Sequence, residues 1–259
     1  MKPRGRSWRP KFSPQQYWNS VPPTATQEFL RTQFSRWGRP ERLRVDNGSP
    51  WGSRGDLPTD LVLWLAGLAV AVQANPPRRP QDNGVVERSQ GTGKRWAEPP
   101  SCRDAAELQR RIDELDQIQR ELYPSIGGKS RLEAFPGLAH SGRSYEPGSE
   151  ASRWDLGPVL SHLGGYTARR EVDSGGSVSL YNRNRYVAAS LRGKRVYVTL
   201  DPGAAEWVVS DKDGVCYQRL NAEELTAERV VGLQVSHRRA RGGRRQTPDS
   251  ELPAQPQVR

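Results

Sequence analysis

Cysteine and histidine are scarce in this chain of 259 residues, which contains 2 cysteines and 3 histidines. Cys102 and Cys216 are too few and too far apart in the sequence for a disulfide framework or a zinc knuckle. The histidines lack ligand spacing, which argues against both a zinc site and a serine–histidine–aspartate triad. No apolar stretch follows the basic first residues as it would in a secretory signal. We therefore expect a cytoplasmic protein with reduced thiols.

Long apolar runs are also absent, and hydrophobic residues make up 34% of the chain. The apolar stretch from Leu61 to Val72 is shorter than the roughly 20 residues that a membrane-spanning helix needs, so no membrane partner is expected. The 25 glycines and 21 prolines indicate long connections around a small core.

Positive charge is what the chain has in excess, with 40 lysines and arginines against 29 acidic residues and a formal net charge of +11. Basic side chains placed against phosphates release condensed counterions, so DNA is the first candidate for a partner. The base composition of the gene is an alternative explanation for the arginine content. We expect residues 1–23 to form a basic, weakly ordered arm and residues 236–259 to form a disordered basic tail.

The first half alternates between helical and strand periodicity, which is typical of an α/β fold. The predicted helices cover 25–37, 61–67, 83–96 and 104–122, and the predicted strands cover 42–45 and 69–72. The apolar positions of the last helix are spaced for burial on one face: Leu108, Ile112, Leu115, Ile118 and Leu122.

The second half changes to short alternating strands separated by turn signals, which predicts a small β-barrel over residues 161–235. Its predicted strands are 177–181, 185–189, 195–200, 206–209 and 215–220. A segment rich in Gly, Ser and Pro precedes it, and we expect residues 137–160 to be a linker.

Two carboxylates stand in contexts that suit metal chemistry. Asp46 directly follows strand 42–45 and precedes Asn47-Gly48, a chain-reversal signal, so it is expected at the carboxyl end of a strand. Glu87 lies near the start of the helix at 83–96. If the two meet, they can share Mg²⁺ or Mn²⁺ for phosphoryl transfer. A turn cap at Asp46 and an arginine partner for Glu87 would explain the same residues without a metal.

Residues 40–52, Pro-Glu-Arg-Leu-Arg-Val-Asp-Asn-Gly-Ser-Pro-Trp-Gly, and residues 75–88 closely resemble the core of DDE insertion-sequence transposases. These enzymes are relatives of retroviral integrases. The resemblance implies a partial RNase H-like core over residues 24–136 and an SH3-like module for the barrel. It also implies that Asp46 and Glu87 are the second and third catalytic acids and the metal ligands. The implied reaction is Mg²⁺- or Mn²⁺-dependent strand transfer between transposon ends and target DNA, and the family also suggests self-association.

The first catalytic Asp of this family has no recognisable counterpart in the chain. Before Asp46 the only acidic residues are Glu28 and Glu41, and neither matches it in position. The resemblance therefore implies an amino-truncated core with exposed strand edges. Because one of three metal-binding carboxylates is missing, we expect a catalytically inactive remnant.

The resemblance also implies contacts with the DNA backbone at Arg78, Arg79, Arg88, Lys94 and Arg95. A solvated basic face is an equal alternative for these residues. A rival prediction for the whole chain is a non-enzymatic DNA-binding protein that uses the barrel and the basic segments. A third is a gene product without function.

Overall fold

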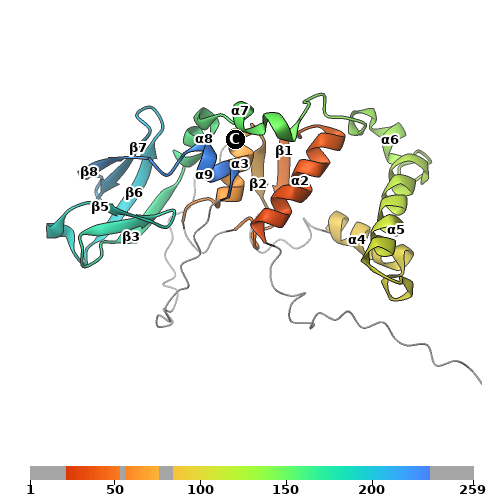
Figure 1. Cartoon of the computed structure of the whole chain (residues 1–259), viewed down its shortest axis with the longest axis horizontal. Coiled ribbons are helices and arrows are strands. Elements are labelled where there is room, and N and C mark those ends of the chain that lie inside the picture. The colour runs from red at the N-terminus through yellow and green to blue at the C-terminus, as the bar shows by residue number, and fades with distance from the viewer. Residues whose placement is uncertain (1–21, 53–55, 76–83, 234–259) are drawn as a thin grey trace, which may run out of the picture.

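The structure is a computed structural model that describes residues 22–52, 56–75 and 84–233 (Figure 1). The predicted basic arm at 1–23 and the predicted tail at 236–259 lie almost entirely outside these ranges. The described part is mixed α/β, with a small parallel sheet in its first half and antiparallel sheets in its second half. No helix in the described ranges is long and apolar enough to cross a membrane.

The first half begins with helix α2 (Pro23–Trp37), which starts two residues before the predicted helix and has a proline as its first residue. Proline suits this position because the first N–H groups of a helix have no partner inside it. Strand β1 (Arg42–Val45) lies where the sequence predicts it. It pairs in parallel with β2 (Ala71–Ala74), which starts two residues later than predicted because Ala69 adopts a left-handed conformation, with φ of 55°, after the helix.

Helix α3 (Asp60–Gly67) connects the two strands and is apolar on nearly all sides. Leu63, Trp64 and Leu65 are fully buried, because α3 packs against β2 and against two later helices, α8 (Leu156–Leu163) and α9 (Ala227–Val231). A helix that is apolar all round needs such cover on every face. Its N-cap is Thr59, whose hydroxyl accepts a hydrogen bond from the Val62 N–H.

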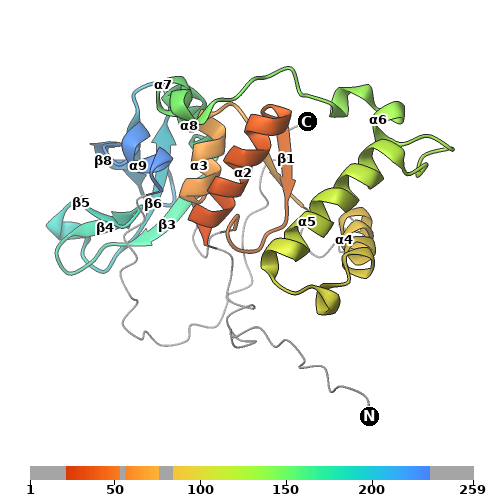
Figure 2. The same ribbon diagram turned by 45° about the vertical axis from the view of Figure 1, so that its right-hand side comes forward.

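The helices that follow pack on one another at one side of the molecule (Figures 1 and 2). They are α4 (Gly84–Ala97), the 3₁₀ turn η2 (Pro99–Ser101), α5 (Ala105–Gln117), the π-helical turn η3 (Ile118–Leu122), α6 (Arg131–Ala134) and the 3₁₀ turn η4 (Pro136–Leu138). The predicted burial of the α5 face is wrong. Ile112 and Ile118 are 37% and 38% exposed and Leu122 is 72% exposed, since α4 covers only part of this face.

The segment predicted as a linker is folded and packed on α3. It contains η5 (Pro147–Ser149), α7 (Glu150–Arg153) and most of α8 (Leu156–Leu163). Tyr145, Trp154 and Val159 are buried in it. Trp154 lies so close to Gly67 that a Cβ at Gly67 would stand 2.1 Å from the indole nitrogen, so α3 needs glycine at its end.

The second half contains a four-stranded antiparallel sheet in the order β3-β6-β7-β8. Its strands are β3 (Thr167–Glu171), β6 (Arg195–Asp201), β7 (Glu206–Ser210) and β8 (Cys216–Asn221). A separate hairpin joins β4 (Ser177–Leu180) to β5 (Arg183–Tyr186), and the 3₁₀ turn η6 (Ala189–Leu191) and helix α9 (Ala227–Val231) complete the half. Four of these strands match predicted ones, and β5 overlaps the predicted strand 185–189 only at residues 185 and 186. The sequence did not predict β3, η6 or α9. The sheets form no closed barrel in the part of the chain that the structure describes.

One cluster of buried side chains runs through both halves. It takes residues from α2, α3 and α8 and continues into β3, β6, β7 and α9, ending at Leu233. The division into a core at 24–136 and a second domain at 161–235 stays a prediction.

Candidate functional site

The carboxyl ends of β1 and β2 form a polar junction, because parallel strands end at the same edge of a sheet. Asp46 follows β1 and Asn75 follows β2. The Asn75 N–H donates to the Val45 carbonyl at 2.8 Å, and the Asn47 side-chain amide donates to the Asn75 carbonyl at 2.8 Å. The Arg44 guanidinium donates to the Asn75 side-chain oxygen. These bonds fix the backbone on both sides of Asp46.

The loop after Asp46 closes tightly on itself. Asp46 Oδ1 accepts a hydrogen bond from the Gly48 N–H at 3.1 Å, and the Gly52 N–H donates to the Gly48 carbonyl at 2.9 Å. A Cβ at Gly52 would lie 2.1 Å from the Asn47 carbonyl oxygen, so only glycine fits there. The Asp46 carboxylate is exposed, and its second oxygen makes no hydrogen bond with the other described residues. The loop therefore presents one hard oxygen ligand at the strand end.

Glu87 lies in the first turn of α4, but its side chain is outside the described part of the structure. Figures 1 and 2 both show α4 lying against α5. Asp46 and Glu87 thus come from a strand end and from a helix, as predicted. Their meeting around one cation stays a prediction.

The predicted DNA contacts divide into two groups. Arg88, Lys94 and Arg95 are exposed on α4. Arg78 and Arg79 lie outside the described residues.

Within the described ranges, no group of three or more His, Cys, Asp or Glu side chains could hold a metal ion. The two acidic residues that precede Asp46 are placed elsewhere. Glu28 forms an ion pair with Arg31 on α2, and Glu41 precedes β1, where its carbonyl accepts the Ala71 N–H. Among the carboxylates that the structure describes, Asp46 alone is therefore available as a metal ligand at the strand end.

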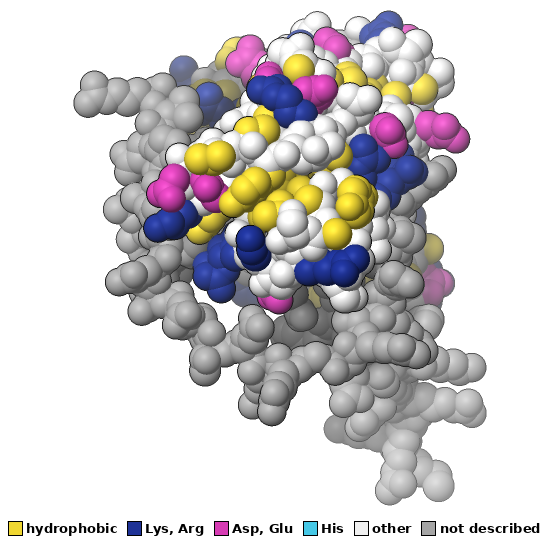
Figure 3. All heavy atoms as spheres, turned by 90° about the vertical axis from the view of Figure 1, so that its left-hand side faces the viewer, with side chains coloured by type: hydrophobic (Ala, Val, Ile, Leu, Met, Phe, Trp, Pro, Cys, Tyr) yellow, Lys and Arg dark blue, Asp and Glu magenta, His cyan; other side chains and the backbone are white. Residues whose placement is uncertain are grey.

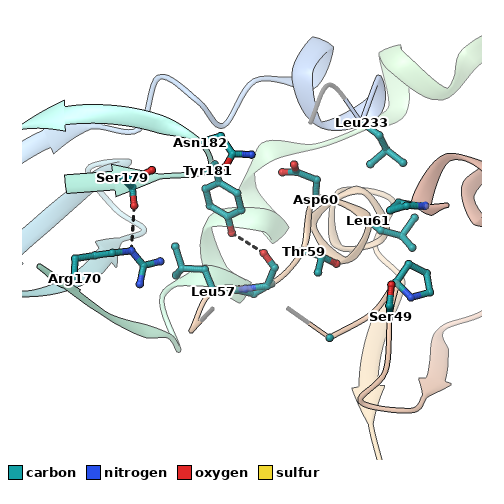
Figure 4. Close-up of a pocket in the computed structure, with 14 residues that line it drawn as sticks. Ser49, Leu57, Thr59, Asp60, Leu61, Arg170, Ser179, Tyr181, Asn182 and Leu233 are labelled. Carbon is teal, nitrogen blue, oxygen red and sulfur yellow. Dashed lines mark hydrogen bonds between the residues drawn. The ribbon is translucent and has the colours of Figure 1, made fainter. Parts of the chain in front are cut away.

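A pocket with a volume of about 520 Å³ adjoins the Asp46 loop (Figure 4). The loop forms one wall through Ser49 and Gly52, and the β4–β5 hairpin forms the opposite wall through Tyr181. We call this the junction pocket, because it lies between the two halves of the chain. Its walls also include the start of α3, where Asp60 is only 8% exposed.

Charged groups are buried behind the junction pocket. Asp60 Oδ1 lies 2.9 Å from Arg229 Nη2, and both side chains are more than nine-tenths buried. The Arg229 guanidinium lies over the Tyr181 ring at 5.1 Å from its centroid. Burial raises the pKa of Tyr181, so its phenol stays protonated and its O–H donates to the Pro58 carbonyl at 3.1 Å. No local sequence pattern connects the members of this cluster, because they are far apart in the chain.

The end of the molecule that carries the β-sheet shows hydrophobic side chains surrounded by a mixture of basic and acidic side chains (Figure 3). In this half Tyr186 is 60% exposed and Tyr217 is 42% exposed. Part of the basic charge is neutralised internally, because Arg219 pairs with Asp201 and Arg185 pairs with Glu223. Arg169 and Arg195 are exposed on β3 and β6.

No family model matches the chain. Among solved structures, the chain is similar to one from the cryoEM structure of the simian T-cell lymphotropic virus intasome in complex with PP2A regulatory subunit B56 gamma. The similarity covers 49% of this chain and 45% of that chain, with 20% sequence identity and a TM-score of 0.36. The chain therefore spans less than half the length of this solved relative.

Proposed function

We propose that this chain is a DNA-binding protein of the integrase and transposase type, with a partial RNase H-like core and an SH3-like module, and that it binds DNA without strand transfer. The observation that carries the proposal is the position of Asp46. It stands before Asn47-Gly48 at the carboxyl end of the parallel strand β1, and the helix that bears Glu87, α4, follows α3 and β2 along the chain. This is the order of elements that the resemblance implies.

Electrostatics support DNA as the partner. The chain carries a net charge of +11, and α4 exposes Arg88, Lys94 and Arg95 on the helix that follows Glu87. Such side chains position a phosphate backbone without reading its sequence. Transposon ends and target DNA are the duplexes that the resemblance implies.

The chemistry of the strand end fits Mg²⁺ or Mn²⁺ in kind, because the exposed Asp46 carboxylate is the hard oxygen ligand that these ions prefer. Asp46 and Glu87 would hold the ion, which would supply positive charge next to a DNA phosphate. Two acids are fewer than the reaction of this family uses. Glu28 is engaged by Arg31 and Glu41 precedes β1, so neither supplies a third. This is why we propose binding without turnover.

A second candidate function is DNA binding that does not involve Asp46. The exposed basic and aromatic side chains of the β-sheet half, such as Arg169, Arg195 and Tyr217, favour it. In this alternative the sheet alone makes the phosphate contacts.

A salt titration of duplex binding, run beside a nicking and strand-transfer assay with Mg²⁺ or Mn²⁺, tests the proposal. The logarithm of the binding constant should fall with the logarithm of salt concentration by about 0.9 for each phosphate contacted. Replacing Arg88, Lys94 and Arg95 with alanine should reduce this slope, whereas replacing Arg169 and Arg195 reduces it if the sheet alone binds. Metal-dependent strand transfer that Asp46→Asn abolishes and Asp213→Asn preserves would overturn the inactive assignment. Duplex binding that does not depend on salt would overturn the proposed phosphate contacts, and failure to bind duplex DNA at low salt would overturn the DNA-binding function.

A further inference from the structure

We propose that the junction pocket binds one unpaired nucleobase, with a preference for the amino-bearing bases adenine and cytosine. This inference rests on the proposed DNA-binding function and assigns to it a site away from Asp46. The pocket volume of about 520 Å³ is in the range of sites for small organic molecules and is ample for one base.

The walls of the junction pocket suit a flat, weakly polar ring. Tyr181 provides an aromatic ring next to Leu57, and Leu61 and Leu233 provide apolar surface on the other side of Asp60 (Figure 4). Base–aromatic stacking is the usual means of holding an unpaired base, because every base has a π-face. Duplex DNA cannot offer a base to such a pocket unless the base leaves the stack.

The backbone at Tyr181 is strained. Tyr181 and Asn182 form the two-residue turn between β4 and β5, with φ of 46° and 63°. Asn tolerates this left-handed conformation, whereas Tyr rarely adopts it. The phenol bond to Pro58 and the overlying Arg229 guanidinium hold the ring in place against the strain. Strain of this kind concentrates at binding sites, where a side chain must be held in one position.

Polar groups at one end of the pocket can read the edge of the base. Asp60 is 92% buried by side chain, and its Oδ1 accepts no hydrogen bond from any described residue, although it lies 2.9 Å from Arg229 Nη2. Figure 4 shows the carboxylate turned toward Tyr181 and Asn182. Asp60 is thus paired in charge with Arg229, but the contact does not meet hydrogen-bond geometry, so Oδ1 can still accept an N–H group that a ligand brings.

The start of α3 adds the complementary donors. The Val62 N–H is satisfied by Thr59, and the N–H groups of Asp60 and Leu61 have no acceptor inside the helix. The Asp60 carboxylate can accept from the exocyclic amine of adenine or cytosine, and a backbone N–H at the start of α3 can donate to the adjacent ring nitrogen. Thymine and guanine present a carbonyl oxygen where these bases present the amine, so it would face the Asp60 carboxylate.

Arg170 can receive the phosphate that accompanies the base. It lines the pocket, donates through Nε to the Ser179 carbonyl at 3.0 Å, and lies 3.6 Å from Asp56. These contacts orient the guanidinium at the pocket wall formed by β3 and β4. Arginine in a fixed orientation is well suited to phosphate oxygens.

Single strands about ten nucleotides long, abasic except for one central base, test this inference. All such strands carry the same phosphates, so the electrostatic contribution to binding is constant and only the base varies. Fluorescence anisotropy should show adenine and cytosine strands binding roughly fivefold or more tightly than the fully abasic strand, as expected for one stacked base. Thymine and guanine strands should gain less.

Two variants remove the base contribution by different routes. Tyr181→Leu removes the stacking ring and Ser179→Trp fills the pocket, and either should reduce all four strands to the affinity of the abasic strand. Circular dichroism and thermal unfolding check that both variants fold. Tyr181→Phe should keep the discrimination, because it retains the ring.

Equal binding of all five strands by the unaltered protein would overturn the inference and leave the DNA-binding function intact. Discrimination that survives in both folded pocket variants would overturn it as well. If even the abasic strand and the duplex fail to bind, the proposed function fails instead.

Discussion

His162 on α8 is a half-buried histidine whose Nε2 atom is buried and without a hydrogen-bond partner among the described residues. Its ring centroid lies 5.2 Å from that of Tyr166. Burial lowers the pKa of His162 below its ordinary value of 6.5. Below pH 6.5 the His162 ring therefore binds a proton more readily in the unfolded chain than in the folded chain. The contribution of His162 to the free energy of unfolding falls as the pH drops through 6.5 toward the folded-state pKa.

Replacing His162 with phenylalanine should remove this pH dependence while keeping an aromatic ring next to Tyr166. Urea titrations give the free energy of unfolding of each protein. The value for His162→Phe minus the value for the unaltered protein should be larger at about pH 5 than at about pH 8. The exposed His140 is the matched control, and His140→Phe should give the smaller change. An equal difference at both pH values for His162→Phe would contradict the argument.

At the residue scale, local sequence patterns predicted where a residue lies on its own strand or helix, but not which distant residues it meets in the fold. The run 42–45 with Asn47-Gly48 after it was sufficient to place Asp46 at a strand end, because strand and turn signals are both local. Asp60 and Tyr181 were not identified, since they are more than a hundred residues apart and meet only when the hairpin packs against α3. No spacing rule within one element could have connected them.

At the scale of elements, α5 and the turn η3 that continues it show that amphipathic spacing predicts a helix and a shared face but not a partner for that face. Leu108 and Leu115 are half-buried, while Leu122 is 72% exposed. Likewise the small number of apolar residues in 137–160 indicated a linker, yet Trp154 and Val159 are buried against α3. A few large side chains can anchor a segment whose average composition is polar.

The free energies of unfolding of two leucine variants distinguish an exposed apolar position from a buried one. Leu122→Gln should change the free energy of unfolding by no more than about 0.5 kcal/mol, as at other exposed positions. Leu65→Ala, in the fully buried α3, should cost about 2–5 kcal/mol because it leaves a cavity. Urea denaturation of both variants compares them. A large loss for Leu122→Gln would mean that the apolar face of η3 is covered in solution.

At the scale of the whole molecule, α9 ties the sheet half to the first half. It follows β8 in the chain but packs against α3 and α7. The Gln27 side-chain amide donates to the Val231 carbonyl at 2.9 Å, and the Arg229–Asp60 ion pair joins α9 to α3. Val230 between these contacts is fully buried. The stability of both halves therefore depends on the contacts that α9 makes with the first half.

Shortening Val230 to alanine should destabilise both halves together. Loss of buried methyl groups should cost roughly 1–3 kcal/mol, and because the core is continuous, the cost should appear in every segment that opens only by global unfolding. Amide hydrogen exchange should accelerate by the same factor in α3 and in β6. Val215→Ala is the matched control, since Val215 is 58% exposed in a turn of the sheet. Faster exchange in β6 with unchanged exchange in α3 would mean that the halves unfold independently, and the shared buried cluster would then not be a cooperative unit.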